Sequence, residues 1–450
     1  MNANEKPAIG VIGVGWVGLV TSGCFAQLGH PVFAVDVDER KVDALRSGGE
    51  LPIHEPGLPE LIERNRERLR FTTEIGDVLD AARLLFCCVD TPPTYSGDAD
   101  LSRVESVIAA LPDGGGHALV MKSTVPAGTG MAIRRRRPGL AYVSCPEFLK
   151  EGSAVQDFLH PDRVVIGADP GSEWAGDAVA DVYEPLGGTQ VRTDVASAEM
   201  IKLASNAFLA TKISFINEIA NVCEEVGADV SEVAGGMGLD DRIGPKFLRA
   251  GIGWGGSCFG KDTIALKKLA GNTGYHFQLL SAVIDVNELQ KRRVVGKLKH
   301  HLGSLAGRRI ALLGLAFKPD TDDMRDAASL VLAARLQGEG AMVRAYDPIA
   351  EQRARELLPD VEISDSPASA LAGADAAILV TEWPEFAELD WEESARRMAN
   401  PLLVDGRNFL DPKAVRDAGI TYEAIGRPSA GDRSAVIRVA PGSEAEDAGR

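Results

Sequence analysis

Short apolar runs alternate with helical patterns over the first part of the chain. Each run is rich in β-branched residues and is followed by apolar residues at helical spacing. This strand–helix alternation is typical of a parallel, doubly wound sheet. We expect strands at residues 8–12, 32–35, 84–89, 118–121 and 141–144, a further strand at 164–167, and helices near 16–28, 38–47 and 102–110.

The pattern changes after Asp194, where apolar positions recur at helical spacing from 197 to 226 without Pro or Gly. These residues predict one helix of roughly 45 Å, at a rise of about 1.5 Å per residue. A helix of this length often joins two domains or packs against its copy in a dimer. More helical sequence follows at 261–271 and 277–302.

Strand–helix alternation resumes after Gly307, with strands expected at 309–313, 342–346, 376–380 and 402–404. We therefore predict an α/β protein of two Rossmann-like, doubly wound parallel-sheet domains, joined by a long central helix and a helical middle domain. The expected divisions are an N-terminal domain at 1–193, a central helical and dimerisation domain at 194–303, a C-terminal domain at 304–427 and a disordered tail at 428–450.

Composition narrows the choice of partners. The 450 residues carry a net charge of −17, from 48 basic and 65 acidic residues, which argues against nucleic acid as a partner. An anionic substrate would have to meet local Lys and Arg groups. No run of about 18 apolar residues predicts a membrane span, and the first residues lack a signal-peptide pattern, so we expect a cytoplasmic protein. The six cysteines show no CxxC pair and no zinc spacing, which predicts free thiols and no metal site.

The first strand runs directly into a glycine pattern, GVGWVG at 13–18, that opens a helix. In a dinucleotide site Gly13 would make the turn, Gly15 would admit the pyrophosphate, and Gly18 would let the helix pack on the strand. The second strand ends in Asp36, whose carboxylate would hold the ribose hydroxyls of NAD and repel the 2′-phosphate of NADP. The pattern predicts an NAD site, and the alternative is an ordinary glycine-rich turn.

The segment GGSCFGKD at 255–262 places Cys258 in a glycine-walled loop, close to Lys261 and Asp262. A nearby Lys can hold a thiol as thiolate, the nucleophilic form. A nucleophilic cysteine beside a hydride acceptor suggests oxidation through a covalent intermediate. The alternative is a buried cysteine at a glycine-rich turn. The other five cysteines lie in apolar segments and are expected only to fill space.

Polar residues interrupt the apolar sequence of the central helix. Lys202 and Asn206 are four residues apart and so share a face. They form either the solvent edge of the helix or an inward catalytic pair, whose N–H groups would stabilise negative charge on an oxygen. The pattern leaves both readings open.

Loops that follow strands carry further candidate groups: Thr124 in KSTVP, and Glu147 and Glu151 in PEFLKEG. Ligands of open α/β sheets bind beyond the carboxyl ends of the strands, so these loops are placed to face the nicotinamide. Carboxylates there could activate water, and capping or turn formation is the alternative role. In the second α/β domain, the turn with Lys318 could bind a different phosphate ligand or be a structural loop.

These motifs together resemble the UDP-glucose/GDP-mannose dehydrogenase family over about residues 8–412. The segments that carry the resemblance stand in family order: GVGWVG, PIHEPGL, STVPAGT, PEFLKEG, KLASNAFLA, RIGPKFL, GGSCFGKD, FKPDTDDMR and DGRN. The GGSCF loop is most similar to the branch that oxidises UDP-glucose.

The resemblance implies a four-electron oxidation, in which UDP-glucose and two NAD give UDP-glucuronate and two NADH. The C6 alcohol would lose hydride to give an aldehyde, and Cys258 would attack the aldehyde to form a thiohemiacetal. A second hydride loss would leave a thioester, which water then cleaves.

The resemblance also implies roles for single residues. Lys202 and Asn206 would stabilise oxyanions. Asp262 and Thr124 would position a water and help to move the alcohol proton, and Glu147 would assist thioester hydrolysis. The NAD site would be formed by Gly13, Gly15, Val17, Gly18, Asp36, Lys41, Val89, Thr91, Ser123, Thr124, Glu151, Lys261 and Arg325.

The same resemblance places the UDP-sugar between the domains. Arg242 would reach the substrate of a neighbouring subunit, which implies at least a homodimer. The residues expected to touch the UDP-sugar in their own subunit are Glu147, Phe148, Leu149, Lys150, Glu151, Lys202, Asn206, Arg249, Gly253, Trp254, Gly255, Lys318 and Arg407.

Two residues depart from the family pattern. Gly260 stands where Pro or Gln is common and should loosen the cysteine loop. Trp254 stands where Phe or Tyr is usual, beside the sugar site, and bears on which sugar is bound.

Three other functions compete with UDP-glucose oxidation. The first is the same chemistry on GDP-mannose or a UDP-N-acetylhexosamine. The second, a two-electron β-hydroxyacid dehydrogenase, leaves Cys258 and the second α/β domain without a purpose. The third is a non-catalytic nucleotide-sugar sensor. The presence of a suitable residue at every expected catalytic position argues against it.

Replacing Asp36 with Asn tests the cofactor assignment. We expect Asp36→Asn to bind NAD more weakly and to tolerate NADP better, because the amide no longer repels a 2′-phosphate. The dissociation constants of both cofactors measure this. An unchanged preference for NAD over NADP would show that Asp36 does not bind the ribose.

Overall fold

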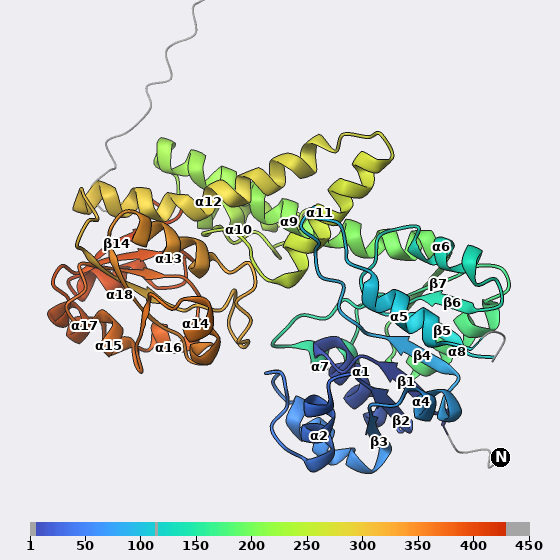
Figure 1. Ribbon diagram of the computed structural model, residues 1–450. Coiled ribbons are helices and arrows are strands. Elements are labelled where there is room, and N and C mark those ends of the chain that lie inside the picture. The colour runs from blue at the N-terminus through green and yellow to red at the C-terminus, as the bar shows by residue number, and fades with distance from the viewer. Residues whose placement is uncertain (1–5, 113–115, 429–450) are drawn as a thin grey trace, which may run out of the picture. The chain divides into compact units, whose positions relative to one another are not determined.

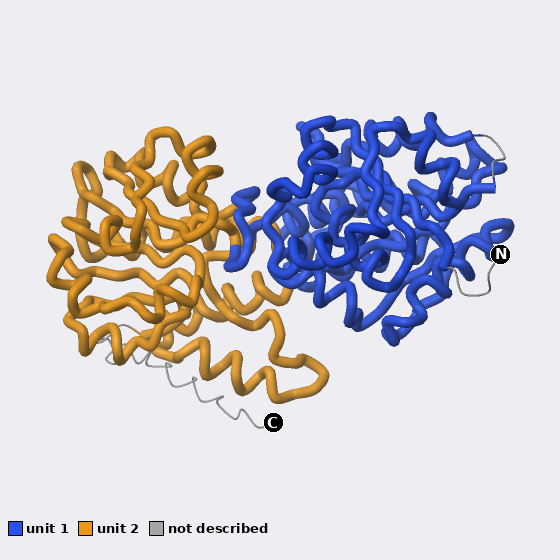
Figure 2. The backbone as a smooth tube through the Cα atoms, turned by 90° about the horizontal axis from the view of Figure 1, so that it is seen from below, with its two compact units in different colours: residues 1–210, 255–282, 318–326 blue, residues 211–254, 283–317, 327–450 orange. Residues whose placement is uncertain are grey.

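The computed structural model describes residues 6–112 and 116–428 (Figure 1). The chain folds into two compact units (Figure 2). The first unit comprises residues 1–210, 255–282 and 318–326, and the second comprises 211–254, 283–317 and 327–450. The expected domain boundaries stay a prediction, and the tail expected to be disordered lies, from residue 429 on, outside the described residues.

The first unit is built on an eight-stranded sheet with the order β3-β2-β1-β4-β5-β6-β7-β8. Four central strands are buried at every position, which explains their continuous apolar sequence. The strands are β1 (Ile9–Ile12), β2 (Val32–Val35), β3 (Leu69–Thr72), β4 (Leu84–Cys87), β5 (Ala118–Met121), β6 (Ala141–Ser144), β7 (Arg163–Ala168) and β8 (Thr189–Thr193).

The sheet differs from the expected all-parallel arrangement at one place. The strand expected at 164–167 exists as β7, but it pairs antiparallel with β6, while β8 pairs parallel with β7. An apolar run predicts that a segment is a strand and does not predict the direction in which it runs. The apolar pattern does not predict β3 and β8, because each of these strands contains several polar residues.

Helices cover both faces of this sheet (Figure 1). On one face, α1 (Trp16–Gln27), α3 (Leu58–Arg64), α7 (Ala154–Leu159) and α8 (Glu173–Tyr183) share an apolar core. On the other, α4 (Ile75–Ala81), α5 (Ser102–Ala110) and α6 (Thr129–Arg136) share a second core. The unit also contains α2 (Glu39–Ser47), α11 (Ser257–Asn272) and the short 3₁₀ helices η1 (Arg66–Arg68) and η2 (Glu184–Leu186).

The second unit contains a six-stranded sheet with the order β11-β10-β9-β12-β13-β14, in which every pairing is parallel. Its strands are β9 (Arg309–Leu313), β10 (Met342–Tyr346), β11 (Glu362–Ile363), β12 (Ala376–Leu379), β13 (Leu402–Asp405) and β14 (Thr421–Ala424). Its helices are α10 (Val230–Gly238), α13 (Ala328–Gly338), α14 (Glu351–Leu357), α15 (Pro367–Leu371), α16 (Pro384–Ala387), α17 (Trp391–Arg397) and α18 (Pro412–Asp417). The four expected strands are confirmed, and β11 and β14 were not anticipated.

Two long helices connect these parts of the chain. The expected central helix is confirmed as α9 (Val195–Val226), which begins in the first unit and ends in the second. Asp194 caps it by accepting hydrogen bonds from Ser197, and Gly227 follows it at φ +76°. The other long helix is α12 (Gln278–Leu302).

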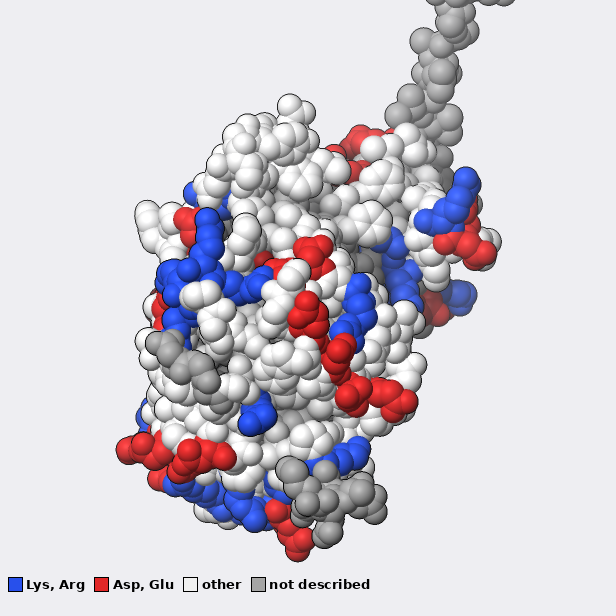
Figure 3. Space-filling model, turned by 90° about the vertical axis from the view of Figure 1, so that its right-hand side faces the viewer, with Lys and Arg blue, Asp and Glu red and all other residues white. Residues whose placement is uncertain are grey.

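The surface shows no single-sign charge field on the face presented in Figure 3, where Lys and Arg side chains are intermixed with Asp and Glu. Among the described residues, no helix is long and apolar enough to cross a membrane.

Candidate active site

The loop between β1 and α1 has the geometry of a dinucleotide-binding turn. Gly13 has φ +93°, and a Cβ on Gly18 would lie 1.8 Å from the Gly13 carbonyl oxygen, so neither position admits a side chain. At Gly15 a Cβ would meet only one atom, an Asp90 carboxylate oxygen at 3.7 Å. Gly15 is the N-cap of α1 and supplies no side-chain cap, so no capping side chain occupies the first N–H groups of the helix. The residues present therefore fit a pyrophosphate.

Asp36 follows β2 and lies beside this loop. Its carboxylate accepts hydrogen bonds from the backbone N–H groups of Val14 at 2.8 Å and Asp38 at 3.0 Å. The two bonds fix the carboxylate against the glycine turn, where a ribose would lie. Val17 and Lys41 are half-buried on α1 and α2.

The loops after β4 and β5 are joined by side-chain hydrogen bonds. The Ser123 hydroxyl donates to the Val89 carbonyl at 2.6 Å, and the Thr91 hydroxyl donates to the Thr124 carbonyl at 2.8 Å. The Lys261 ammonium donates to the Thr91 hydroxyl at 3.4 Å. The structure thus brings these five expected cofactor residues together at the carboxyl ends of the strands.

Lys202 faces inward from α9, which excludes the solvent-edge position for this residue. Its ammonium lies 2.8 Å from a Glu147 carboxylate oxygen, and the two residues are only 3% and 7% exposed. Burial opposes ionisation of Glu147, but the Lys202 charge and hydrogen bond outweigh it and lower the pKa of that carboxyl. Burial likewise opposes the Lys202 charge, but Glu147, Asp262 and Cys258 raise its pKa. The pair is therefore ionised at neutral pH.

Asn206 lies one turn further along the same face of α9. Its amide donates to an Asp262 carboxylate oxygen at 2.6 Å, and both residues are buried. The other Asp262 oxygen lies 2.9 Å from the Lys261 ammonium. The inward reading is thus confirmed for Asn206 as well, since the solvent-edge alternative requires exposure.

Cys258 is the second residue of α11, and Gly256 caps that helix at φ +85°. Its side chain is exposed, whereas the other five cysteines are buried as expected. A helix N-terminus favours a thiolate. Here the surrounding protein desolvates the sulfur, and Glu147, Asp262 and Glu151 add negative charge, so the pKa of the thiol is raised to about 11 despite Lys202. The thiol is therefore protonated at rest.

Two sequence-based expectations for the cysteine loop were wrong. Lys261 does not hold a thiolate, because its ammonium is engaged by Asp262 and Thr91. Gly260 does not loosen a loop, because it lies inside α11. A Cβ there would approach an Asp326 carboxylate oxygen to 2.6 Å, so the glycine accommodates close packing.

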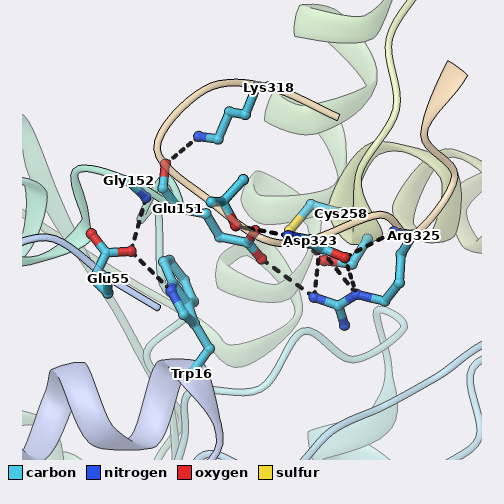
Figure 4. Close-up of polar contacts among 10 residues, drawn as sticks. Trp16, Glu55, Glu151, Gly152, Cys258, Lys318, Asp323 and Arg325 are labelled. Atoms are coloured by element: carbon cyan, nitrogen blue, oxygen red, sulfur yellow. Dashed lines mark hydrogen bonds and ion pairs between the residues drawn. The ribbon is translucent and has the colours of Figure 1, made fainter. Parts of the chain in front are cut away.

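A second group of charges surrounds Glu151 (Figure 4). Its carboxylate accepts from the Thr321 hydroxyl at 3.2 Å and lies 3.3 Å from the Arg325 guanidinium, which also pairs with Asp323 at 2.8 Å. Lys318 donates to the Glu151 carbonyl. Burial and the negative charge of Asp323 raise the pKa of Glu151 to about 7, although the positive charges of Arg325 and Lys318 lower it. Glu151 can therefore take up or release a proton near neutral pH.

Of the other residues in the PEFLKEG loop, Phe148 lies beside Lys202. The Arg163 guanidinium lies 3.8 Å from the centre of the Phe148 ring, and the Lys202 ammonium lies 5.4 Å from it. Leu149 donates its N–H to Glu147 at 2.7 Å, which holds the loop in a tight turn. Lys150 is exposed and pairs with Asp157.

The remaining substrate candidates belong to the second unit, except for Gly255, which is half-buried in the first. Arg407 donates to the Gly253 carbonyl at 2.8 Å, and Trp254 is buried, with its indole N–H 3.2 Å from the Ser214 hydroxyl. Arg242 is exposed and pairs with Asp240 at 2.6 Å. Arg249 is also exposed.

Two buried carboxylates escaped the sequence analysis. Glu199 accepts from the N–H groups of Gly128 and Gly130 at 2.7 and 2.8 Å and from the Tyr142 hydroxyl. It precedes Lys202 by one turn of α9, a spacing that could have revealed it. Glu55 accepts hydrogen bonds from Trp16 and from the loop after Glu151. The only sequence feature that pointed to Glu55 was its place in the PIHEPGL segment.

A Rossmann-like fold with a glycine turn, an acid after the second strand and an exposed cysteine beside buried Lys and Asn defines a dinucleotide-dependent dehydrogenase. Three family models match the chain: the NAD binding domain of the UDP-glucose/GDP-mannose dehydrogenase family at residues 7–187, its central domain at 196–289 and its UDP binding domain at 311–412. The chain belongs to this family, and the expected NAD-binding domain is confirmed.

Known relatives are similar over nearly the whole chain. A UDP-glucose 6-dehydrogenase of Bacillus subtilis is 44% identical, over 98% of this chain and 97% of the relative. A UDP-glucose 6-dehydrogenase of Rhizobium meliloti is 45% identical, over 93% and 99%. The solved UDP-glucose dehydrogenase of Pyrobaculum islandicum has a TM-score of 0.87 at 38% identity, over 95% of this chain and 99% of that structure.

Removing Lys202 tests the buried ion pair. We expect Lys202→Met to lower the free energy of unfolding by about 3–5 kcal/mol, because the buried Glu147 carboxylate loses its counter-charge. The double variant Lys202→Met/Glu147→Gln should recover most of this loss. Chemical denaturation of the ligand-free proteins measures both.

The control is Lys413→Met, which removes an exposed lysine paired with Asp417 and should leave the free energy of unfolding almost unchanged, because an exposed ion pair contributes little. Equal effects of Lys202→Met and Lys413→Met would contradict the importance of the buried pair.

Proposed function

We propose that this protein oxidises C6 of UDP-glucose to the carboxylate, giving UDP-glucuronate and two NADH. The observation that carries the proposal is the exposed Cys258 beside buried Lys202, Asn206 and Asp262. The similarity of the chain to the UDP-glucose 6-dehydrogenases of Bacillus subtilis and Rhizobium meliloti supports this substrate. NAD, when bound, supplies the hydride acceptor for each of the two oxidations.

In the first oxidation the C6 hydroxyl must lose its proton as the hydride leaves. Thr124 and Asp262 are proposed to position a water that takes this proton. Asp262 is held for this role by Asn206 at 2.6 Å. Of the three N–H donors on the Lys202 ammonium, one is used by Glu147, and the others are available to stabilise a developing alkoxide.

Cys258 then adds to the aldehyde. The S–C bond forms as the thiol proton passes to the former carbonyl oxygen, which gives a thiohemiacetal. The pKa of the thiol in the ligand-free protein is raised to about 11, so the sulfur carries a proton before the substrate binds and gives it up in this step. Loss of a hydride and of the hydroxyl proton converts this adduct to a thioester.

Hydrolysis of the thioester requires an activated water. Water adds to the acyl carbon, the C–S bond breaks, and Cys258 recovers its proton. Glu147 and Glu151 are the proposed groups beside this water. Glu147 is tied to Lys202, whereas Glu151 has a pKa near 7 and so can exchange the proton that this step releases.

The nucleotide part of the substrate is assigned to cationic and backbone groups. Lys318 and Arg407 are proposed to bind the diphosphate of the UDP-sugar, and Gly253, Trp254 and Gly255 to line the sugar. The burial of Trp254 and its contact with Ser214 turn its ring into the interior of its unit. With its ring directed into the interior, Trp254 would line the sugar with its backbone, so its larger ring does not argue for a different sugar.

Counting NADH formed per sugar consumed tests the proposal. With UDP-glucose we expect two NADH and UDP-glucuronate, and little reaction with GDP-mannose or UDP-N-acetylglucosamine. Cys258→Ser should form no acid, because the hydroxyl cannot provide the thioester. Cys223→Ser, which changes a buried cysteine on α9, should keep the yield of two NADH.

One NADH per sugar would show that oxidation stops at the aldehyde. Acid formation by Cys258→Ser at the parent rate would overturn the thioester. Preferential oxidation of another nucleotide sugar would move the assignment to that substrate.

The protein is also proposed to form a homodimer through α9. Phe208, Phe215 and Val222 recur at seven-residue intervals on this helix and are 65%, 49% and 56% exposed. A seven-residue apolar repeat is typical of a helix that packs against another helix. Arg242 is proposed to reach the neighbouring subunit's substrate. The cytoplasmic location stays a prediction.

Sedimentation velocity tests the dimer. We expect the parent to sediment as a dimer and Phe215→Glu to shift toward monomer, because a charge is placed in the apolar stripe. Leu357→Glu, on an exposed position of α14, should remain dimeric. A monomeric parent, or an unshifted Phe215→Glu, would contradict the proposed interface.

A further inference from the structure

Glu55 is a buried carboxylate with three hydrogen-bond donors. It is 2% exposed, and it accepts from the Trp16 indole N–H at 2.9 Å, the Gly152 N–H at 2.8 Å and the Ala154 N–H at 2.8 Å. All three donors lie in the first unit and come from two segments that are separate in sequence; Figure 4 shows two of them, Trp16 and Gly152, beside Glu55. Glu55 itself lies in a third segment, ahead of α3.

One of these loops binds the dinucleotide. Trp16 is the first residue of α1 and stands between the second and third glycines of the turn. A displacement of the α1 N-terminus would move the indole, because side chain and helix share the same Cα. The hydrogen bond from the indole N–H therefore couples the position of the glycine turn to the position of Glu55.

The other loop carries the proposed catalytic carboxylates. Gly152 follows Glu151 directly and has φ +80°, and a Cβ there would lie 2.9 Å from the Asp320 Cβ. Ala154 is the first residue of α7, so Glu55 also satisfies free N–H groups at the start of that helix. The side chain of Glu151 is bound on its far side by Thr321 and Arg325. The position of Glu151 thus depends on the contact between Glu55 and Gly152.

We propose that Glu55 is a positioning residue that links the dinucleotide loop to the loop 147–154, so that a bound dinucleotide steadies the backbone at Glu151. The inference rests on the proposed function for the role of Glu151. That function uses two dinucleotides in succession on one sugar, which is bound to Cys258 from the aldehyde stage until hydrolysis. A link of this kind orders the hydrolytic loop when a dinucleotide is present.

A purely structural role for Glu55 makes a different prediction. If Glu55 only satisfied the start of α7, its contact with Trp16 would be incidental, and dinucleotide binding would leave loop 147–154 unchanged. Trp16→Phe separates the two roles, because it removes the indole N–H and keeps an aromatic ring and the two backbone bonds to Glu55.

Hydrogen–deuterium exchange of peptides from residues 147–160, with and without NADH, tests the proposal. NADH fluorescence confirms that each protein is saturated. In the parent we expect NADH to slow amide exchange in this segment by about threefold or more. In Trp16→Phe we expect the same exchange as the parent without NADH, within about twofold, and no further slowing with NADH. Glu55→Gln should exchange faster in both states, because one amide oxygen cannot accept three bonds.

Trp174→Phe, which changes an exposed tryptophan on α8, is the matched control and should behave as the parent. The proposal is overturned if NADH leaves the parent segment unchanged, or if Trp16→Phe keeps the full effect of NADH. A parent that shows the NADH effect but forms no NADH from UDP-glucose would contradict the proposed function and leave this link intact. A parent that forms NADH from UDP-glucose but shows no slowing of amide exchange by NADH would support the proposed function and contradict this link.

Discussion

The ion pair between Lys202 and Glu147 is the interaction on which the rest of the site depends. Charges buried this deeply are tolerated only when they are paired and further hydrogen-bonded. The pair meets both conditions, because Glu147 also accepts the N–H of Leu149. It joins α9 to the loop after β6 and sets the electrostatic field in which Cys258 and Asp262 lie. If either partner moved outward, the other would be left as an unpaired charge inside the protein.

Polar residues on one face of α9 extend this constraint to three elements. Glu199 holds the start of α6, Lys202 holds the loop after β6, and Asn206 holds α11. Their spacing of three and four residues places them in line along the helix. A single rigid helix thereby fixes the relative positions of groups that are far apart in the sequence, which is how a site made from several loops keeps its geometry.

Much of this arrangement could be predicted from the sequence, because local patterns carry it. The glycine turn, Asp36 and most strands follow from periodicity and spacing, and the resemblance to a family supplied the roles of Lys202 and Asn206, which periodicity left open. The direction of β7 could not be predicted, since it depends on pairing with β6. Glu55 and Glu199 were missed because their partners are mainly backbone N–H groups of distant loops; the helical spacing of Glu199 from Lys202 and the PIHEPGL segment were their only sequence signals. The state of Cys258 was misjudged because only Lys261 is near it in sequence, whereas desolvation by the surrounding protein and the nearby Glu147 and Glu151 arise from the fold.

The protonated state of Cys258 affects the resistance of the protein to oxidation. Peroxide and electrophiles attack the thiolate, and a thiol with a pKa of about 11 holds only about one part in ten thousand as thiolate at pH 7. An exposed, permanently ionised cysteine would be consumed by oxidants whenever no substrate was present. Desolvation of the sulfur, together with the carboxylates around Cys258, therefore protects the thiol from oxidation when no substrate is bound.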